Sequence, residues 1–325
     1  MTTSLQAKDP ATWVDYLSMA RPGHWVKHVF IVPGVVLAIL LRPQPWPEVI
    51  ARIILGFVSA ALIASANYVL NEWLDAKADA HHHSKSSRPA VAKSLSASWV
   101  WFEYAVLVVL GLVAALAVSK LFFLVSCLFL FSALVYNVPP VRSKDLAFLD
   151  VISESINNPI RLTLGWVMVD PSSLPPGSLL LGYWMAGAFL MALKRLAEYR
   201  SARDNDRLEN LGLYRGSFQI YTEESLILSS FLYALLAAFF LAVFLIKYRI
   251  EYLLSLPIFA ALFVSYLRVA LKQDSRAQAP EQLFRERTLV GLVGLLALVL
   301  VLLTWVDIPM LEKLTDPHYI EILLD

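Results

Sequence analysis

The segment "NEWLDAKADAHHHSKSSRP" (residues 71–89) follows the apolar run "IILGFVSAALIASA" (53–66), so a stretch of membrane length ends in charged side chains. Within it, Asn71, Asp75 and Asp79 are spaced four residues apart and therefore stack along one face of a helix. Adjacent carboxylates repel each other unless a cation lies between them. Oxygen ligands alone favour Mg²⁺ over zinc, and Mg²⁺ usually binds one or two carboxylates together with substrate phosphates.

We therefore predict a Mg²⁺ site at this row, with Mn²⁺ as an alternative ion. The predicted metal ligands are Asn71, Glu72, Asp75 and Asp79. The competing interpretation is a solvated helix end with ordinary surface acids. The metal site is favoured because the row emerges directly from an apolar run, where charges are costly, and because the bases Lys85 and Arg88 follow it.

Three consecutive histidines at 81–83 lie inside the same segment. They cannot all face one metal from a helix, and no second His or Cys pair lies nearby in the sequence, so a zinc site is disfavoured. One of them, His81 or His83, is a candidate contact for a substrate phosphate.

The composition is that of a membrane protein. Of 325 residues, 58% are apolar and only 16% are charged, against roughly a quarter in an ordinary soluble domain. The net charge of +1 gives no indication of a nucleic-acid partner, and membrane lipids are the expected surroundings. The single cysteine, Cys127, excludes a disulfide within the chain and a cysteine-based metal site.

Runs long enough to cross about 30 Å of hydrocarbon predict an all-α integral membrane fold with nine transmembrane helices. The predicted spans are 25–41, 51–70, 98–118, 121–138, 146–169, 178–194, 225–246, 252–271 and 288–306. We expect a single domain over 1–325, with a cytoplasmic amphipathic segment at 1–23 and an extracytoplasmic tail at 307–325. The N-terminus lacks the features of a signal peptide.

Basic residues set the predicted orientation. Most of the 27 Lys and Arg residues fall at the N-terminus and in the loops that share its side. By the positive-inside rule this side is cytoplasmic, so we predict a multi-pass protein of the cytoplasmic (inner) membrane. The N-terminus and a polar pocket would face the cytoplasm, and the C-terminus would lie outside.

Two further polar clusters fall on the same side. In "YNVPPVRSKDLAFLDVISESINNPIRL" (136–162) the prolines end a helix, and a polar stripe with helical spacing then runs inside a predicted span. The loop bases are Arg142 and Lys144, and the stripe comprises Asp150, Glu154, Asn157 or Asn158, and Arg161. The side chains of the stripe either face a cavity or pair with one another, as in a structural Glu154–Arg161 ion pair.

The second cluster is "LKRLAEYRSARDNDR" (193–207), where Lys194, Arg195 and Glu198 close the sixth span. Bases at a helix end can simply extend to the membrane surface. That interpretation does not account for Glu198, four residues after Lys194.

These motifs resemble the UbiA superfamily of intramembrane prenyltransferases. "NEWLDAKAD" is similar to its N-D-x-x-D-x-x-x-D motif, with Glu72 in the first aspartate position, and "RPGHWVK" (21–27) and the "RP" at 88–89 also fit. The resemblance covers nearly the whole chain and implies a UbiA-type bundle that binds a diphosphate through Mg²⁺. It implies catalytic roles for Asp75, Asp79 and Glu198, and it adds Lys27 and Tyr136 to the predicted substrate-binding residues. That full set is Lys27, Lys85, Arg88, Tyr136, Arg142, Lys144, Asp150, Glu154, Asn158, Arg161, Lys194 and Arg195.

One departure indicates a branch of the superfamily. Where typical members carry a second aspartate-rich motif, this chain has "KRLAEYR" (194–200), which resembles the branch typified by decaprenyl-phosphate phosphoribosyltransferase. That branch implies 5-phosphoribosyl diphosphate as donor and a polyprenyl phosphate as acceptor. The extra phosphates of these substrates call for Arg and Lys in place of a second carboxylate cluster.

The first hypothesis is therefore a transferase that moves 5-phosphoribosyl to a membrane polyprenyl phosphate and releases diphosphate, as in the biosynthesis of a cell-envelope glycolipid. The second keeps the fold and moves a prenyl group from prenyl diphosphate to an aromatic or other small acceptor. The third is a transporter, which predicts charges near the bilayer midplane rather than at one membrane face. Isoprenoid length and oligomeric state stay open.

Overall fold

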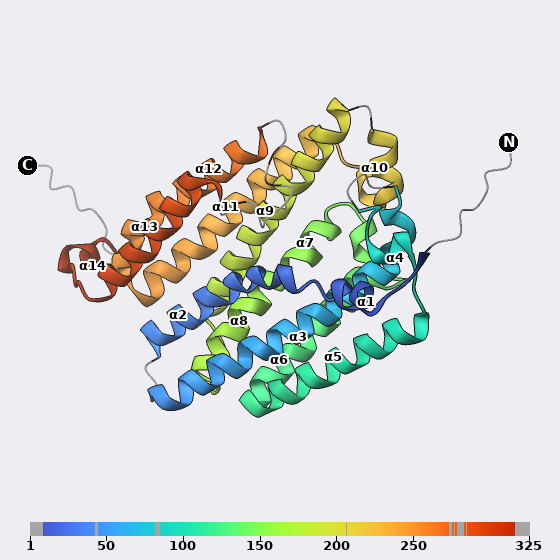
Figure 1. Cartoon of the computed structure of the whole chain (residues 1–325). Coiled ribbons are helices and arrows are strands. Elements are labelled where there is room, and N and C mark those ends of the chain that lie inside the picture. Colours follow the sequence, from blue (N-terminus) through green and yellow to red (C-terminus); the bar gives the residue numbers. More distant parts are fainter. Residues whose placement is uncertain are drawn as a thin grey trace, which may run out of the picture.

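Long apolar helices form almost the whole molecule, seen in a computed structural model that describes residues 9–42, 45–81, 85–205, 207–272, 275, 277, 283 and 285–315 (Figure 1). Eight helical segments of this described part are long and apolar enough to cross a membrane. They are Trp13–Leu41, Trp46–Asp79 (α3), Ala97–Val118 (α5), Lys120–Asn137 (α6), Gly177–Asp204 (α9), Glu223–Tyr248 (α11), Ile250–Ala270 and Arg287–Thr304 (α13). The predicted all-helical membrane fold is confirmed.

Two of these segments are composite. Trp13–Leu41 contains α1 (Trp13–Met19), the 3₁₀ helix η1 (Pro22–Ile31) and α2 (Val32–Leu41). Ile250–Ala270 contains η4 (Ile250–Ser255) and α12 (Leu256–Ala270). The shorter elements are β1 (Asp9–Pro10), α4 (Pro89–Ala92), β2 (Lys93–Ser94), η2 (Ser143–Asp145), α7 (Leu149–Ser155), α8 (Asn157–Val169), α10 (Leu208–Tyr214), η3 (Gly216–Gln219) and α14 (Pro309–Thr315).

The fifth predicted span, 146–169, forms as α7 and α8 instead of one long helix. Pro159 has no N–H to donate to the carbonyl of Ser155, where α7 ends, so the proline accounts for the interruption. The two helices follow each other across Ile156. At about 1.5 Å per residue they are together long enough to cross about 30 Å of hydrocarbon. The count of nine spans remains a prediction.

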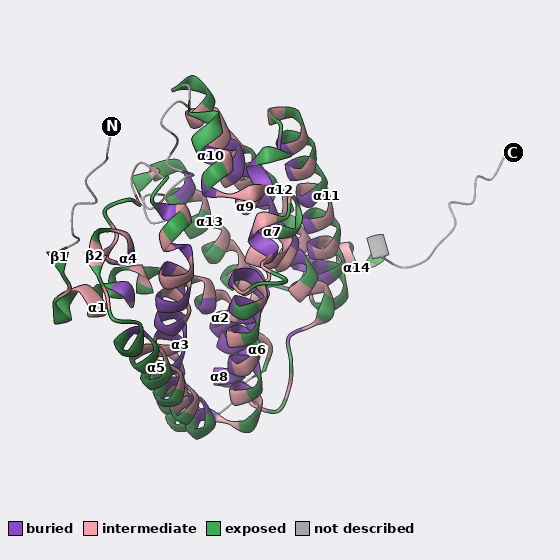
Figure 2. Ribbon diagram, turned by 90° about the vertical axis from the view of Figure 1, so that its right-hand side faces the viewer, coloured by how far each residue is buried: buried purple, intermediate pink, exposed green. Residues whose placement is uncertain are grey.

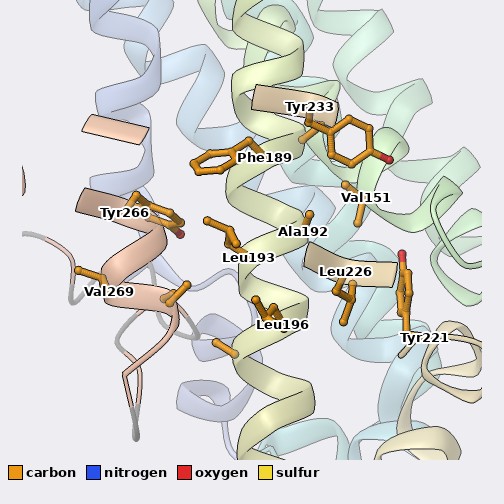
Figure 3. Packing of buried hydrophobic residues seen from close by; sticks show 14 of the residues in the cluster. Val151, Phe189, Ala192, Leu193, Leu196, Tyr221, Leu226, Tyr233, Tyr266 and Val269 are labelled. Atoms are coloured by element: carbon orange, nitrogen blue, oxygen red, sulfur yellow. The ribbon is translucent and has the colours of Figure 1, made fainter. Parts of the chain in front are cut away.

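Two large clusters contain most of the buried apolar side chains of the described helices. In one, α9 lies against α11 and α12, and Figure 3 shows Phe189, Leu193 and Leu196 of α9 among aromatic and aliphatic side chains of those neighbours. In the other, α2, α3, α5, α6 and α8 share a second core. Glycines allow α2 to cross α8 closely, because a Cβ on Gly34 would lie 2.0 Å from the carbonyl oxygen of Leu162.

The outer faces of the helices are apolar and exposed, whereas their inner faces are buried (Figure 2). Phe131 on α6 and Leu298 on α13, for example, are 59% and 56% exposed. In an apolar bundle of this kind, such faces meet lipid. The chain is therefore an integral membrane protein.

The N-terminal segment lies against the loop that follows α4. β1 pairs in parallel with β2, with Asp9 opposite Lys93, and this two-residue pairing is a small exception to the predicted all-α chain. In α1, Trp13 and Leu17 are each 67% exposed while Met19 is fully buried, as expected for an amphipathic helix. Figure 1 shows α1, α4 and α10 at the same end of the bundle, which we call the polar end, and α14 at the opposite end.

Candidate active site

The acidic row lies in the last turns of α3, at the polar end. Glu72, Asp75 and Asp79 are 2%, 8% and 1% exposed, so the row faces the interior of the protein and not the solvent. The helix runs without interruption from the apolar span into the row, as the spacing predicted. A solvated helix end with ordinary surface acids is therefore wrong.

Each carboxylate of the row has a basic partner from a different segment. Arg21 Nη2 lies 2.5 Å from Glu72 Oε2, and Arg88 Nη1 lies 2.5 Å from Asp79 Oδ2. Four stretches of chain therefore converge on one helix end: the turn before η1, the loop before α4, the loop after α6, and α3 itself.

Asp75 receives two cations from the loop after α6. Arg142 Nη2 donates to Asp75 Oδ1 at 2.9 Å, and the Lys144 ammonium donates to the same oxygen. Lys144 also donates to Asn137 Oδ1 at 2.8 Å, an atom that in addition accepts from Asn71 Nδ2 at 2.6 Å. Burial lowers the pKa of Lys144 to about 8, while its contact with Asp75 acts in the opposite direction.

Two of these arginines have a left-handed backbone. Arg21 has φ 48° and Arg142 has φ 29°, a region that non-glycine residues adopt rarely. Such conformations cost about 1–3 kcal/mol each and persist where the surrounding structure holds them. Here the ion pairs to Glu72 and Asp75 hold them, and such strain is concentrated at functional sites.

The second cluster is centred on Arg195 of α9, which is fully buried. Its Nε donates to Asp150 Oδ2 at 2.8 Å, and its Nη2 donates to Glu154 Oε2 at 2.5 Å. Its Nη1 donates to Glu198 Oε2 at 3.2 Å. The guanidinium is surrounded by three carboxylates, so the predicted direct grip of Arg195 on a substrate phosphate does not match this geometry.

Tyr136 and Arg215 complete this cluster. The Tyr136 hydroxyl donates to Glu154 Oε2 at 2.8 Å and accepts from Arg215 Nη1 at 3.1 Å. Arg215 also lies 3.5 Å from Asp150 Oδ2. The Lys194 ammonium is 3.9 Å from Glu154 Oε1, and its side chain is 20% exposed. Lys194 and Arg215, more than Arg195, are therefore placed to meet a substrate.

Lys85 lies between the two clusters. Its ammonium is 4.3 Å from the centre of the Tyr214 ring and contacts the Tyr214 hydroxyl. Burial lowers the pKa of Lys85 to about 8, and the charges of Glu198 and Asp79 act against that shift. The Arg215 guanidinium of the second cluster lies 5.7 Å from the centre of the same Tyr214 ring, so Lys85 and Tyr214 connect the two clusters into one polar site.

Lys27 borders the site, because its ammonium and the Arg21 guanidinium each lie 5.8 Å from the centre of the Tyr68 ring. Asn158 and Arg161 contact other parts of the bundle. Asn158 packs against α9, where a Cβ on Gly187 would lie 2.1 Å from its Nδ2. Lys27 lies beside His24, with 3.2 Å between Nζ and Nδ1. Arg161 stacks 5.2 Å from the centre of the Phe129 ring and forms no ion pair with any described residue. The Glu154–Arg161 pair that the spacing left open is wrong, because the ion pairs of Glu154 go to Arg195, Lys194 and Arg215.

The sequence prediction missed three site residues: Arg21, Asn137 and Arg215. Arg21 stands in the quoted "RPGHWVK", and Asn137 stands beside Tyr136 in "YNVPP", so both were within reach of the motif argument. Arg215 follows α10 and had no local signal. His81 is exposed, and His82 and His83 lie outside the described residues.

The acidic row has donors that fit a hard cation. Glu72 Oε1 and Asp79 Oδ1 are buried without a hydrogen-bond partner in the described part of the chain. Unsatisfied buried carboxylate oxygens are costly, and an oxygen-ligated ion such as Mg²⁺ would satisfy them. Among the described residues, no three His, Cys, Asp or Glu side chains are already arranged closely enough to hold a metal ion.

Comparison with known proteins places this geometry in context. The profile of the UbiA prenyltransferase family matches residues 30–288. The nodulation protein NoeC of Azorhizobium caulinodans is 29% identical over 197 residues, which is 59% of this chain and 59% of that protein. Decaprenyl-phosphate phosphoribosyltransferase of Mycobacterium tuberculosis is 33% identical over 113 residues, which is 34% of this chain and 36% of that enzyme. The chain thus matches less than two thirds of the length of either relative.

A solved structure shows the same fold. The UbiA homolog from Archaeoglobus fulgidus bound to GPP and Mg²⁺ superimposes with a TM-score of 0.67 at 20% identity, covering 88% of this chain and 97% of that one. The UbiA-type bundle predicted from the sequence is confirmed.

Proposed function

Because the chain belongs to the UbiA prenyltransferase family, we propose that it is a single-domain, Mg²⁺-dependent transferase of the cytoplasmic membrane. It moves 5-phosphoribosyl from phosphoribosyl diphosphate to a membrane polyprenyl phosphate and releases diphosphate. The polar end faces the cytoplasm, where the donor is soluble, and the C-terminus lies outside, in keeping with the positive-inside rule.

The observation that carries this proposal is the supply of cations on both sides of the polar site. Arg88, Arg142 and Lys144 surround the acidic row, while Lys194 and Arg215 lie beside Glu154. A donor with a diphosphate and a 5-phosphate, together with a phosphate acceptor, needs cations at several separate positions. The likeness to decaprenyl-phosphate phosphoribosyltransferase supports the same substrates.

The residues of the row have distinct roles in this proposal. Asn71, Glu72, Asp75 and Asp79 would hold Mg²⁺, which when bound neutralises charge on the departing diphosphate. Lys144 and Arg142 fix the orientation of Asp75. Arg88 and Lys85 add positive charge beside the leaving group, and Glu198 holds Arg195 and balances the charge of Lys85.

The reaction needs no general base. The bond between ribose C1 and the diphosphate oxygen breaks, and its electron pair leaves on the diphosphate. An oxygen of the acceptor phosphate, already ionised at neutral pH, forms the new bond to C1. The protein therefore acts by holding the two anionic substrates and by stabilising charge on the leaving group.

We expect purified protein with Mg²⁺ to convert phosphoribosyl diphosphate and polyprenyl phosphate into a phosphoribosylated lipid, detected by mass spectrometry of the lipid fraction. The same preparation should be offered geranyl diphosphate with aromatic acids, because the structurally similar UbiA homolog was solved with GPP and Mg²⁺. A prenylated acid without any phosphoribosylated lipid would establish prenyl transfer instead.

A chelator should abolish turnover, and Mg²⁺ or Mn²⁺ should restore it, since every candidate ligand in the row is a hard oxygen donor. The measurement is the initial rate after dialysis against the chelator and readdition of single metal ions. Restoration by Zn²⁺ alone would contradict an all-oxygen site.

A further inference from the structure

Two polar side chains lie in the bundle below the acidic row and have buried hydrogen-bonding atoms without partners among the described residues. His28 of η1 is only 8% exposed, and neither of its ring nitrogens has a hydrogen-bond partner among the described residues. The Nε atom of Arg161, on α8, is likewise buried without a hydrogen-bond partner among the described residues. Burying a polar group inside a membrane bundle without a hydrogen bond costs free energy, so we expect a bound ligand to pair with these atoms.

His28 and Arg161 are neighbours. Arg161 is close enough for its charge to act on His28 and on Tyr183 of α9. The Tyr183 hydroxyl in turn donates to the carbonyl oxygen of Phe30, two residues after His28, at 3.2 Å. No described carboxylate forms an ion pair with either residue, and the acids of the two clusters above pair with other bases. Arg161 therefore carries a positive charge without a counterion among the described residues, and this charge favours the binding of an anion.

The location of this pair relative to the acidic row fits a binding site for the acceptor phosphate. Arg161 stacks on Phe129, whose carbonyl oxygen accepts from Asn67 Nδ2 at 3.4 Å. Asn67 precedes Asp75 by two helical turns, which corresponds to about 12 Å along α3. Arg161 thus lies on the membrane side of the row, at a distance that a sugar ring and an attacking phosphate could bridge.

An apolar groove leads from lipid to His28. A cavity of about 480 Å³ is lined by Trp25, His28, Val29, Val32, Phe57, Val58, Ala61 and Leu62, from η1, α2 and α3. Trp25 and Val58 are 46% and 48% exposed, so the groove opens on the outer surface of the bundle. An apolar chain in this groove would place its polar end beside His28.

We propose that His28 and Arg161 bind the phosphate of the lipid acceptor, whose isoprenoid chain lies in the groove between η1–α2 and α3. This inference rests on the proposed phosphoribosyl transfer, because it assigns the second substrate of that reaction. The planar guanidinium of Arg161 can donate two N–H groups to one phosphate, and the imidazole of His28 adds a third donor. Among the described residues, neither side chain forms a hydrogen bond or ion pair with the acidic row, where the donor diphosphate is expected.

The test measures lipid binding without the donor. Protein in nanodiscs is titrated with polyprenyl phosphate, and binding is compared for wild type, Arg161→Gln, Arg161→Lys and His28→Gln. We expect the two glutamine variants to bind at least tenfold more weakly and Arg161→Lys to recover part of the loss. In turnover, the KM for the lipid should rise by a similar factor while the KM for phosphoribosyl diphosphate stays within about twofold.

Arg268→Gln is the matched control, because Arg268 is an exposed arginine in the last turn of α12, away from the groove. Unchanged lipid binding in Arg161→Gln and His28→Gln would overturn the inference, even if the transfer reaction itself is confirmed. Equally tight, Arg161-dependent binding of phosphatidylglycerol would also overturn it, since the pair would then hold an ordinary membrane lipid. Should Arg161→Gln fail to fold, the binding of His28→Gln and Arg161→Lys decides.

Discussion

Asp75→Asn and Asp79→Asn should each lower turnover by at least about a hundredfold while leaving a folded membrane protein. Both side chains are buried in the row at the end of α3, and Asp79 has an oxygen without a partner in the described chain. Asparagine keeps the volume but removes the negative charge that a metal requires. Charge stabilisation at a leaving group is realised mainly in the transition state, so the effect should fall on kcat.

The two variants differ in a useful way. Asp75→Asn leaves Lys144 and Arg142 without their shared anion, so some loss of thermal stability is expected as well. Asp79→Asn frees only Arg88, which is 21% exposed and can reach water. Asp204→Asn, at the exposed end of α9, is the matched control and should retain full activity. Near-normal turnover in both row variants at saturating Mg²⁺ would remove the row from the active site.

The acidic row was predictable because its geometry is local. Asn71, Asp75 and Asp79 belong to one uninterrupted helix, and helical spacing alone aligns them. The membrane fold was equally accessible from the apolar runs. Pro159 indicated an interruption of the fifth span, but the length of the apolar run favoured one continuous helix.

The partners of buried charges were not predictable in this way. Glu154 and Arg161 have spacing for a pair within one span, yet Glu154 pairs with Arg195 from another helix and Arg161 with no described acid. Helical spacing places side chains on a face but does not say which neighbouring helix that face meets. Arg21 and Arg215 join the site for the same reason, through contacts between segments that are distant in the sequence.

Arg195→Met should lower the free energy of unfolding by about 3–5 kcal/mol, because it leaves buried carboxylates without their counterion. Asp150 is fully buried, and Glu154 and Glu198 share the same guanidinium. Arg195 is therefore a positioning residue that fixes three acids and, through Glu154, the hydroxyl of Tyr136. Arg195→Lys should recover only part of the stability, since an ammonium cannot reach three acids with the geometry of a planar fork.

A double variant separates this role from a direct grip on substrate. Arg195→Met combined with Asp150→Asn removes one buried charge of each sign, so thermal unfolding in detergent should show a smaller loss than Arg195→Met alone. If Arg195 instead held a substrate phosphate, its replacement would raise one KM by tenfold or more at nearly unchanged stability, and Asp150→Asn would restore nothing. Because three carboxylates already surround the guanidinium, we expect the loss of stability to dominate, with the two KM values changing together.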